Sequence, residues 1–157
     1  MAEKTLAIIW YSYTGGSRQM AEAAAEAARD AGEGDVSVRL LDAREAGPDD
    51  LLSADAMLFV FPENLAAIAG EMKAFFDRSY YPCLGRLEGR PYALLVCAGS
   101  DGENAVRQAE RIATGWRLKQ AAPSATIAAL HLTSILVVKS RLISKLNSPR
   151  SQYNFQG

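Results

Sequence analysis

The stretch Ser12-Tyr13-Thr14-Gly15-Gly16-Ser17 decides the fold of this chain. It lies between an apolar run over residues 6–11, rich in β-forming side chains, and an alanine-rich run over residues 18–31 with apolar positions at helical spacing. These patterns predict a buried strand, a tight turn and a helix. Such a turn is suited to a phosphate, because the first helical N–H groups have no internal partner and the helix dipole attracts negative charge there.

The chemistry of this turn favours a phosphate monoester. Gly15 and Gly16 would let the backbone approach an anion closely. The hydroxyls of Ser12, Thr14 and Ser17 can donate hydrogen bonds to it. The turn has neither the lysine and spacing of a nucleotide-triphosphate loop nor the GxGxxG spacing of a dinucleotide-binding loop. The alternative interpretation is that Ser17 only caps the helix and the glycines only form a tight turn.

Length, composition and charge indicate an ordinary globular protein. With 157 residues, 49% hydrophobic and 22% charged, we expect a single domain over residues 1–146 and a disordered tail over residues 147–157. The formal net charge of −1 argues against an extended nucleic-acid surface. Residues 1–110 nevertheless hold 10 Lys and Arg against 18 Asp and Glu, whereas residues 111–157 hold 7 Lys and Arg and no acid. The basic segment either contacts an acidic partner or packs against the acidic body.

The cysteines and the histidine exclude several kinds of site. Cys83 and Cys97 form no CxxC motif and are typical of a reducing compartment. His131 is the only histidine, so a histidine-rich metal site is excluded, and no metal is expected. The most apolar stretch, residues 125–138, is too short to span a membrane, and the first residues show no secretory signal. We therefore expect a cytoplasmic protein that binds no membrane.

Beyond the first helix the chain alternates strands and helices, which favours an α/β fold with a parallel sheet and right-handed crossovers. In such sheets a ligand lies beyond the carboxyl ends of the strands. Loops 12–17, 62–69 and 99–103 all follow strands and carry small or polar residues, so the last two would flank something flat beside the phosphate. This convergence favours a flavin. The expected strands cover residues 36–41, 56–61 and 92–98. The expected helices cover residues 70–78 and 104–115, and residues 80–91 are expected to form a loop.

These loops resemble those of the flavodoxin-like family, and in particular of its NAD(P)H-dependent FMN and quinone reductases. The Ser-x-Thr-Gly-x-Ser loop resembles the FMN phosphate loop. Pro62-Glu63-Asn64, followed by a helix with Lys73, Phe75 and Asp77-Arg78, resembles the second FMN loop, and Ala98-Gly99-Ser100-Asp101-Gly102 resembles the third. The resemblance covers about residues 5–123. It implies a three-layer sandwich with a five-stranded parallel sheet in the order 2-1-3-4-5. The cofactor-binding residues that it implies are Ser12, Tyr13, Thr14, Gly15, Gly16, Ser17, Pro62, Glu63, Asn64, Leu65, Ala98, Gly99, Ser100, Asp101 and Gly102.

Two departures from the family pattern stand out. Leu65-Ala66-Ala67 occupies the place where the family often has aromatic residues that stack on the flavin ring, and Leu65 would supply the nearest apolar contact instead. The end of the chain is irregular: residues 125–138 would supply the fifth strand, and residues 139–146 would form only a short helix.

Three functions follow from the resemblance. The first is an FMN-dependent oxidoreductase that passes reducing equivalents from NAD(P)H to a quinone or a similar small molecule, with no catalytic side chain because the flavin supplies the chemistry. The second is an electron carrier of the flavodoxin type, although such carriers are usually strongly acidic. The third is a flavodoxin-like domain that has lost FMN. The resemblance also implies a homo-oligomer, a dimer or a tetramer, that completes the flavin site.

Overall fold

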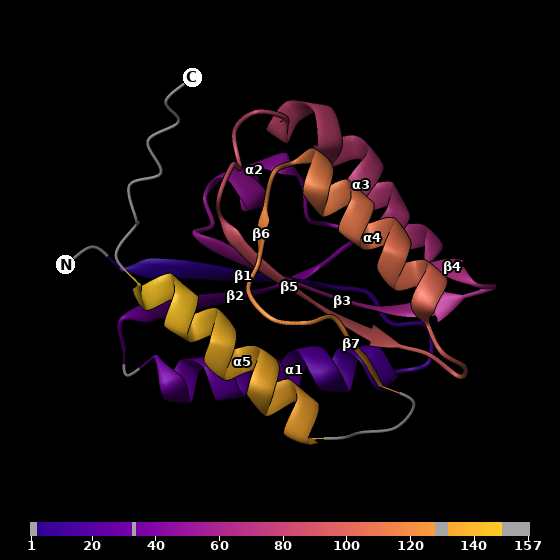
Figure 1. Ribbon diagram of the computed structural model, residues 1–157, viewed down its shortest axis with the longest axis horizontal. Coiled ribbons are helices and arrows are strands. Elements are labelled where there is room, and N and C mark those ends of the chain that lie inside the picture. The colour runs from indigo at the N-terminus through magenta and orange to yellow at the C-terminus, as the bar shows by residue number, and fades with distance from the viewer. Residues whose placement is uncertain (1–2, 33, 128–131, 149–157) are drawn as a thin grey trace.

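The computed structural model describes residues 3–32, 34–127 and 132–148, in which strands and helices alternate along the chain around a central sheet (Figure 1). The alternation predicted from the sequence is confirmed. The elements are β1 (Lys4–Trp10), α1 (Gly16–Ala31), β2 (Val36–Asp42), α2 (Pro48–Leu52), β3 (Ala56–Asn64), β4 (Ala67–Ile68), α3 (Gly70–Cys83), β5 (Pro91–Cys97), α4 (Glu103–Gly115), β6 (Lys119–Gln120), β7 (Ala125–Ile127) and α5 (Leu132–Asn147).

The sheet has the strand order β2-β1-β3-β5-β6, with β7 also paired to β5 and all of these pairs parallel. This is the predicted flavodoxin-like order, with the fifth strand divided into two short pieces, β6 and β7. Strand β3 is central, and its apolar residues 56–61 are all buried, as a strand covered on both faces requires. Strand β2 lies at the edge and is half-buried, as its alternating sequence predicts.

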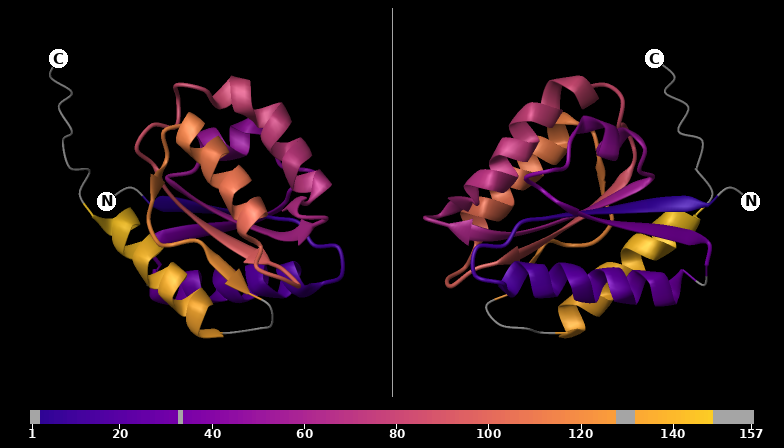
Figure 2. Two further views of the ribbon diagram at one scale, coloured as in Figure 1. Left: turned by 45° about the vertical axis from the view of Figure 1, so that its right-hand side comes forward. Right: turned by 180° about the vertical axis from the view of Figure 1, so that it is seen from behind.

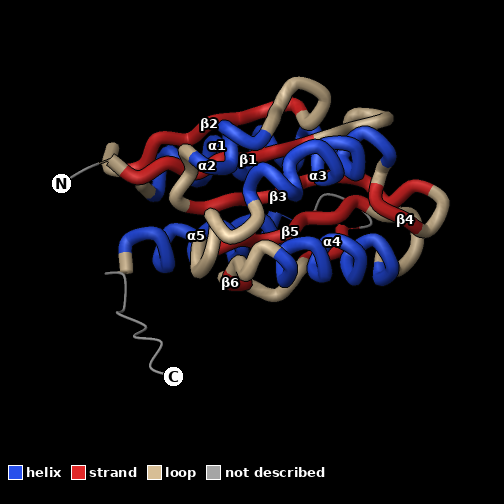
Figure 3. Tube along the Cα trace, turned by 90° about the horizontal axis from the view of Figure 1, so that it is seen from above, coloured by secondary structure: helices blue, strands red, loops and turns tan. Residues whose placement is uncertain are grey.

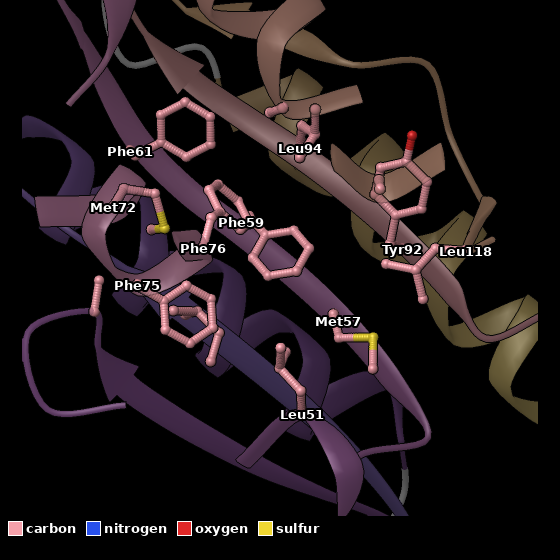
Figure 4. Packing of buried hydrophobic residues seen from close by; sticks show 14 of the residues in the cluster. Leu51, Met57, Phe59, Phe61, Met72, Phe75, Phe76, Tyr92, Leu94 and Leu118 are labelled. Atoms are coloured by element: carbon pink, nitrogen blue, oxygen red, sulfur yellow. The ribbon is translucent and has the colours of Figure 1, made fainter. Parts of the chain in front are cut away.

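Helices cover both faces of the sheet and make a three-layer sandwich (Figures 2 and 3). Helices α1 and α5 lie side by side on one face, and α2, α3 and α4 lie on the other. Each face has its own apolar core. The core under α3 and α4 is rich in aromatic rings, and its larger labelled residues in Figure 4 are Leu51, Met57, Phe59, Phe61, Met72, Phe75, Phe76, Tyr92, Leu94 and Leu118.

Helix α1 packs closely on the sheet because its inward positions are small. Met20, Ala24 and Ala28, predicted to share one face, are all buried. They contact a second core that contains Leu6 and Leu58 from the sheet. Alanine favours the helix and lets the backbone approach the strands. This packing fixes the start of α1, and with it the position of the loop over residues 12–17.

The prediction of a long fifth strand over residues 125–138 is wrong. Strand β7 ends at Ile127, and residues 132–147 form one long helix, α5, instead of a strand followed by a short helix. Val138, Leu142 and Leu146 recur every four residues and are buried against the core of α1, which stabilises a helix here. A short apolar run does not distinguish a strand from a buried helix. His131 and most of the predicted tail, residues 149–157, lie outside the described residues.

Two further boundaries differ from the prediction. Helix α3 continues to Cys83 with Pro82 inside its last turn, where a loop was expected. The Tyr80 ring stacks on Trp116 at 5.7 Å between ring centres, and the Trp116 indole N–H donates to the Tyr80 carbonyl (3.0 Å), which holds this extension in place. Strand β3 continues through residues 62–64, where the strand was expected to end, and pairs with β4 in a hairpin.

Candidate functional site

The three predicted loops meet at the carboxyl edge of the sheet. They follow β1, β3 and β5, which are neighbours in the sheet, and Trp10 pairs with Val60 while Pro62 pairs with Cys97. The Ser100 hydroxyl donates to a carboxylate oxygen of Glu63 (3.2 Å), which joins the second loop to the third. The loop after β1 contacts the end of β5. Loops separated by nearly ninety positions in the sequence thus lie at one edge of the sheet (Figure 1).

The first loop is folded by its own side chains. The Gly15 N–H donates to the Ser12 hydroxyl oxygen (2.9 Å), and Gly15 has a φ of 105°, which glycine adopts without strain. Helix α1 then begins at Gly16 without a side-chain cap. The interpretation that Ser17 is merely the helix cap is therefore wrong: Ser17 lies inside the first turn of α1.

The hydroxyl of Ser17 is the feature of this loop that best fits a phosphate ligand. Ser17 is only 2% exposed, and its Oγ has no hydrogen-bond partner among the described residues. A buried hydroxyl without a partner costs about 1–3 kcal/mol, so such a group usually serves a ligand or a water molecule. The nearby helix N–H groups and the helix dipole favour an anion at the same place. The loop therefore fits the phosphate of FMN. Thr14 and Tyr13 are exposed, Tyr13 at 76%.

Cys97, at the end of β5, lies next to Gly16 of this loop. A Cβ atom on Gly16 would lie 3.3 Å from the Cys97 Sγ, so the glycine allows the loop to rest closely on the end of β5. Cys97 is partly buried and forms no disulfide. The sequence identified Gly16 as a close-approach position but did not identify Cys97 as its neighbour, because no local pattern links residues so far apart.

The second loop is a two-residue hairpin turn. Leu65 and Ala66 connect β3 to β4 with φ values of 49° and 61°, a left-handed conformation that is rare for residues other than glycine. Leu65 is fully exposed, at 102%. The Asn104 side chain donates to the Ala66 carbonyl, and the Ile68 N–H donates to the Gln108 side chain (3.0 Å). The first two turns of α4 thus hold this hairpin through side-chain hydrogen bonds.

The third loop begins with a buried residue and ends in a glycine. Ala98 is 4% exposed, and its N–H donates to the Ile127 carbonyl (3.3 Å), so its side chain belongs to the core. Gly102 has a φ of 69°, and a Cβ atom there would lie 2.7 Å from Thr126. The Asp101 carboxylate accepts the Glu103 N–H at the start of α4 (2.8 Å). The exposed part of the loop is therefore its middle, Gly99-Ser100-Asp101, which leaves backbone groups available to a ligand.

A cluster of charged and aromatic side chains borders the first loop. Arg18 lies over the Trp10 ring, 5.7 Å from its centre, and forms an ion pair with Glu22 (2.9 Å). At the end of the neighbouring strand β2, the hydrogen bond from the Arg44 guanidinium (2.6 Å) holds the pKa of Asp42 below its ordinary value. Sequence reasoning missed this cluster. The available signal was that Trp10 and Arg18 lie close to the two ends of the loop motif in the sequence.

Other kinds of site find no support in the described residues. Within residues 3–32, 34–127 and 132–148, no three or more His, Cys, Asp or Glu side chains are grouped to hold a metal ion. In the same part of the chain, no helix combines the length and the hydropathy needed to cross a membrane.

Comparison with known proteins supports the same type of site. The family described as "NADPH-dependent FMN reductase" matches residues 45–131, a range that contains the second and third loops and begins after the first. A flavodoxin from Aquifex aeolicus strain VF5 is 36% identical over 93 residues, which cover 59% of this chain and 47% of the relative. An NAD(P)H dehydrogenase (quinone) from Deinococcus radiodurans is 33% identical over 97 residues, covering 46% of this chain and 47% of the relative. The chain thus spans about half the length of these curated relatives.

Solved structures share the fold at low sequence identity. A flavodoxin from the domain Archaea superposes with a TM-score of 0.78 at 17% identity, over 92% of this chain and 99% of that one. An oxidoreductase from Corynebacterium diphtheriae superposes with a TM-score of 0.78 at 19% identity, over 93% of this chain and 98% of that one. At such identities the likeness shows the flavodoxin-like fold alone.

Proposed function

The chain belongs to the family of NADPH-dependent FMN reductases, and from this membership we propose that it binds FMN. The FMN would lie between loops 12–17, 62–65 and 98–102. The protein would pass reducing equivalents from NAD(P)H to a quinone or a similar small acceptor. Family membership supports a flavin-dependent redox protein, either an oxidoreductase or a flavodoxin. The choice of NAD(P)H and of a quinone rests on the family's description and on the name of one relative. The observation that carries the proposal is the buried, unpartnered hydroxyl of Ser17 at the start of α1.

The first loop would hold the phosphate. The hydroxyls of Thr14 and Ser17 would donate hydrogen bonds to its oxygens, and the free N–H groups at the start of α1 would add further donors. Ser12 already accepts the Gly15 N–H, so it would act by keeping the loop in this shape. No cation is needed within the loop, because hydrogen bonds to an anion from preorganised N–H groups and the helix dipole are strong.

The other two loops would hold the ring. The hairpin tip at Leu65 would cover one side of it, and the exposed backbone of Gly99-Ser100-Asp101 would face its polar edge and stabilise negative charge there. The hydrogen bond between Ser100 and Glu63 would keep the two loops at a constant separation. When bound, the flavin supplies the redox chemistry, so none of these side chains has to act as an acid or a base.

Titration of the apoprotein with FMN, followed by quenching of flavin fluorescence, tests the proposal. We expect saturable one-to-one binding at about micromolar concentration or tighter, and a loss of at least about a hundredfold in affinity when Thr14 and Ser17 are both replaced by alanine. Thr114→Ala is the matched control, since this exposed hydroxyl on α4 only donates to the Glu110 carbonyl. No binding by the wild-type protein would mean that the residues at positions 65–67 no longer hold a flavin, and it would refute the enzyme proposal.

A flavodoxin-type electron carrier is the second candidate, favoured by the relative named a flavodoxin and by the acidic residues 1–110. Oxidation of NADPH separates the two candidates. An oxidoreductase loaded with FMN consumes NADPH continuously when a quinone is supplied, whereas a carrier does so only when a separate reductase is added. The predicted homo-oligomer remains a proposal that size measurements on the same preparation would test.

A further inference from the structure

A groove lies between α5 and the segment that joins β6 to β7. It has a volume of about 360 Å³ and is lined by Ala121, Ser140, Arg141, Ser144 and Lys145. This volume falls within the range of small-molecule sites, which begins at about 300 Å³, and the groove is widely open to solvent. Four of the five lining residues carry hydroxyls or positive charges. The lining therefore carries two positive charges and two hydroxyls on a largely aliphatic surface.

The four polar residues form one cluster because of their helical spacing. Ser140 and Ser144 are one turn apart on α5, as are Arg141 and Lys145, so their side chains are neighbours on the helix surface. All four are exposed. The opposite face of the helix is buried against α1 and the sheet, which fixes the direction of the cluster; that face contains Val138, Leu142, Ile143 and Leu146.

The two cations of this cluster have no counterion among the described residues. Arg141 and Lys145 form neither an ion pair nor a hydrogen bond with any described residue, and the sequence contains no Asp or Glu after Glu110. Like charges one turn apart on a helix repel each other. Glu110 itself accepts hydrogen bonds from Ser124 (2.7 Å) and Gln120 (3.2 Å) and does not line the groove. An unneutralised pair of this kind is what a bound anion would stabilise.

The hydroxyls complete the set of donors. Ser144 Oγ makes no hydrogen bond within the described part of the chain, and Ser140 Oγ donates only to the Val137 carbonyl of its own helix (3.1 Å). A guanidinium, an ammonium and two hydroxyls on one wall can all donate to the oxygens of a phosphate group, and hydrogen bonds of charged donors to phosphate are strong. The dipole of α5 favours cations near its carboxyl end, which alone would explain the positive charge there. It would explain neither the groove nor the hydroxyls.

We propose that this groove is a binding site for a phosphate-bearing small molecule of nucleotide size, held by Arg141 and Lys145 with help from Ser144. The site is separate from the flavin loops. The Ala121 N–H donates to the carbonyl of Tyr92, near the start of β5, so the groove lies toward the amino end of that strand, whereas the flavin loops follow the carboxyl ends of the strands. The proposal does not depend on the proposed function.

Calorimetric titration with 5′-AMP tests the site, with adenosine as the uncharged control ligand. We expect AMP to bind and adenosine not to bind. Arg141→Ala and Lys145→Ala should each weaken AMP binding about tenfold or more, because each removes a charged donor. The matched control is Arg111→Ala, an exposed cation on α4 outside the groove, which should leave the affinity within about twofold.

A second variant separates this site from the flavin loops. The Thr14→Ala, Ser17→Ala protein should bind AMP as the wild type does, and excess AMP should not displace FMN. Three results would overturn the proposal: no heat of binding at about 1 mM AMP, equal affinity for adenosine and AMP, or AMP binding that survives Arg141→Ala and disappears in the loop variant. Self-association that Arg141→Ala abolishes and AMP leaves unchanged would also overturn it, and would assign the face to a second copy of the chain.

Discussion

Two serine hydroxyls, those of Ser17 and Ser79, are buried without a hydrogen-bond partner in the described part of the chain. Ser17 is 2% exposed in the first turn of α1, beside the loop proposed to bind phosphate, and Ser79 is fully buried in α3. Both carry the cost of a desolvated polar group. They differ in position: only Ser17 lies where a ligand could compensate that cost.

Replacing Ser17 by alanine should therefore separate stability from binding. We expect the free energy of unfolding of the apoprotein to rise by about 1 kcal/mol, because an unsatisfied hydroxyl is removed, while the affinity for FMN falls about tenfold. Ser79→Ala is the matched control, with a similar gain in stability and no change in FMN affinity. Denaturant unfolding and FMN titration of the same three proteins give both quantities. A Ser17→Ala protein that loses stability and binds FMN normally would contradict the assignment.

Tyr92 makes the stability sensitive to high pH. Burial raises the pKa of its phenol to about 12, from an ordinary value of about 10. Since the folded pKa lies above the unfolded one, the stabilisation is complete below pH 10 and is lost as the pH rises from about 10 to about 12, by up to roughly 2–3 kcal/mol. Denaturant unfolding at a series of pH values measures it. The difference in stability between the wild type and Tyr92→Phe should be independent of pH below about pH 10 and should change as the pH rises from about 10 to about 12. A difference that stays constant over this range would show that the phenol does not titrate as argued.

At the scale of elements, the hairpin of β3 and β4 combines strain with rigidity. Its turn holds Leu65 and Ala66 in the left-handed conformation, which costs about 1–2 kcal/mol for a residue with a Cβ atom. Hydrogen bonds from Asn104 to the turn and from Ile68 to Gln108 keep the hairpin against α4. Strain that is held by surrounding contacts in this way is typical of functional positions.

Ala66→Gly should relieve part of this strain. We expect the free energy of unfolding to rise by about 1 kcal/mol, because glycine adopts a positive φ without cost and suits the second position of this turn. Thermal or denaturant unfolding measures the change. Ala67→Gly, one residue later in β4, serves as the control and should lower stability, since glycine weakens a strand. Loss of stability in both variants would show that the turn is not strained.

For the whole molecule, α5 is the element that completes the sandwich. It forms the second helical layer together with α1, and its inward side chains join the core beneath both helices. The irregular end expected from the sequence is therefore an integral part of the fold up to Asn147. The outward face of the same helix carries the cations that line the groove, so one element serves both the core and the proposed anion site.

Leu142→Ala tests this role of α5. Leu142 is 1% exposed and contributes to the core under α1 and α5. We expect the free energy of unfolding to fall by about 2–4 kcal/mol, because the substitution leaves a cavity among well-packed neighbours. Leu136→Ala, at an exposed position of the same helix, should change it by less than about 0.5 kcal/mol. Denaturant unfolding of both variants decides the matter, and equal effects would show that α5 is not docked on the sheet.

Local patterns predicted most of the strands and helices, and they predicted that three loops would meet at one edge of the sheet. The turn at residues 12–17 lies between a run of β-formers and a run of helix formers, and both elements formed as predicted because their preferences agree with their burial. The apolar run before Pro62 likewise predicted the central strand. The three loops could be assigned to one edge of the sheet from the sequence, because parallel strands place their carboxyl ends together.

What the sequence determined by itself was the order of elements and the chemistry of the loops, since both depend on residues close together in the chain. Only the tertiary structure decided that residues 132–147 form a helix, because the same apolar run suits a strand until its burial against α1 is known. The close contact of Gly16 with Cys97 was likewise decided by the tertiary structure. So was the lack of a partner for the Ser17 hydroxyl, because a hydrogen-bond partner, or its absence, depends on atoms that the chain brings together only when it folds.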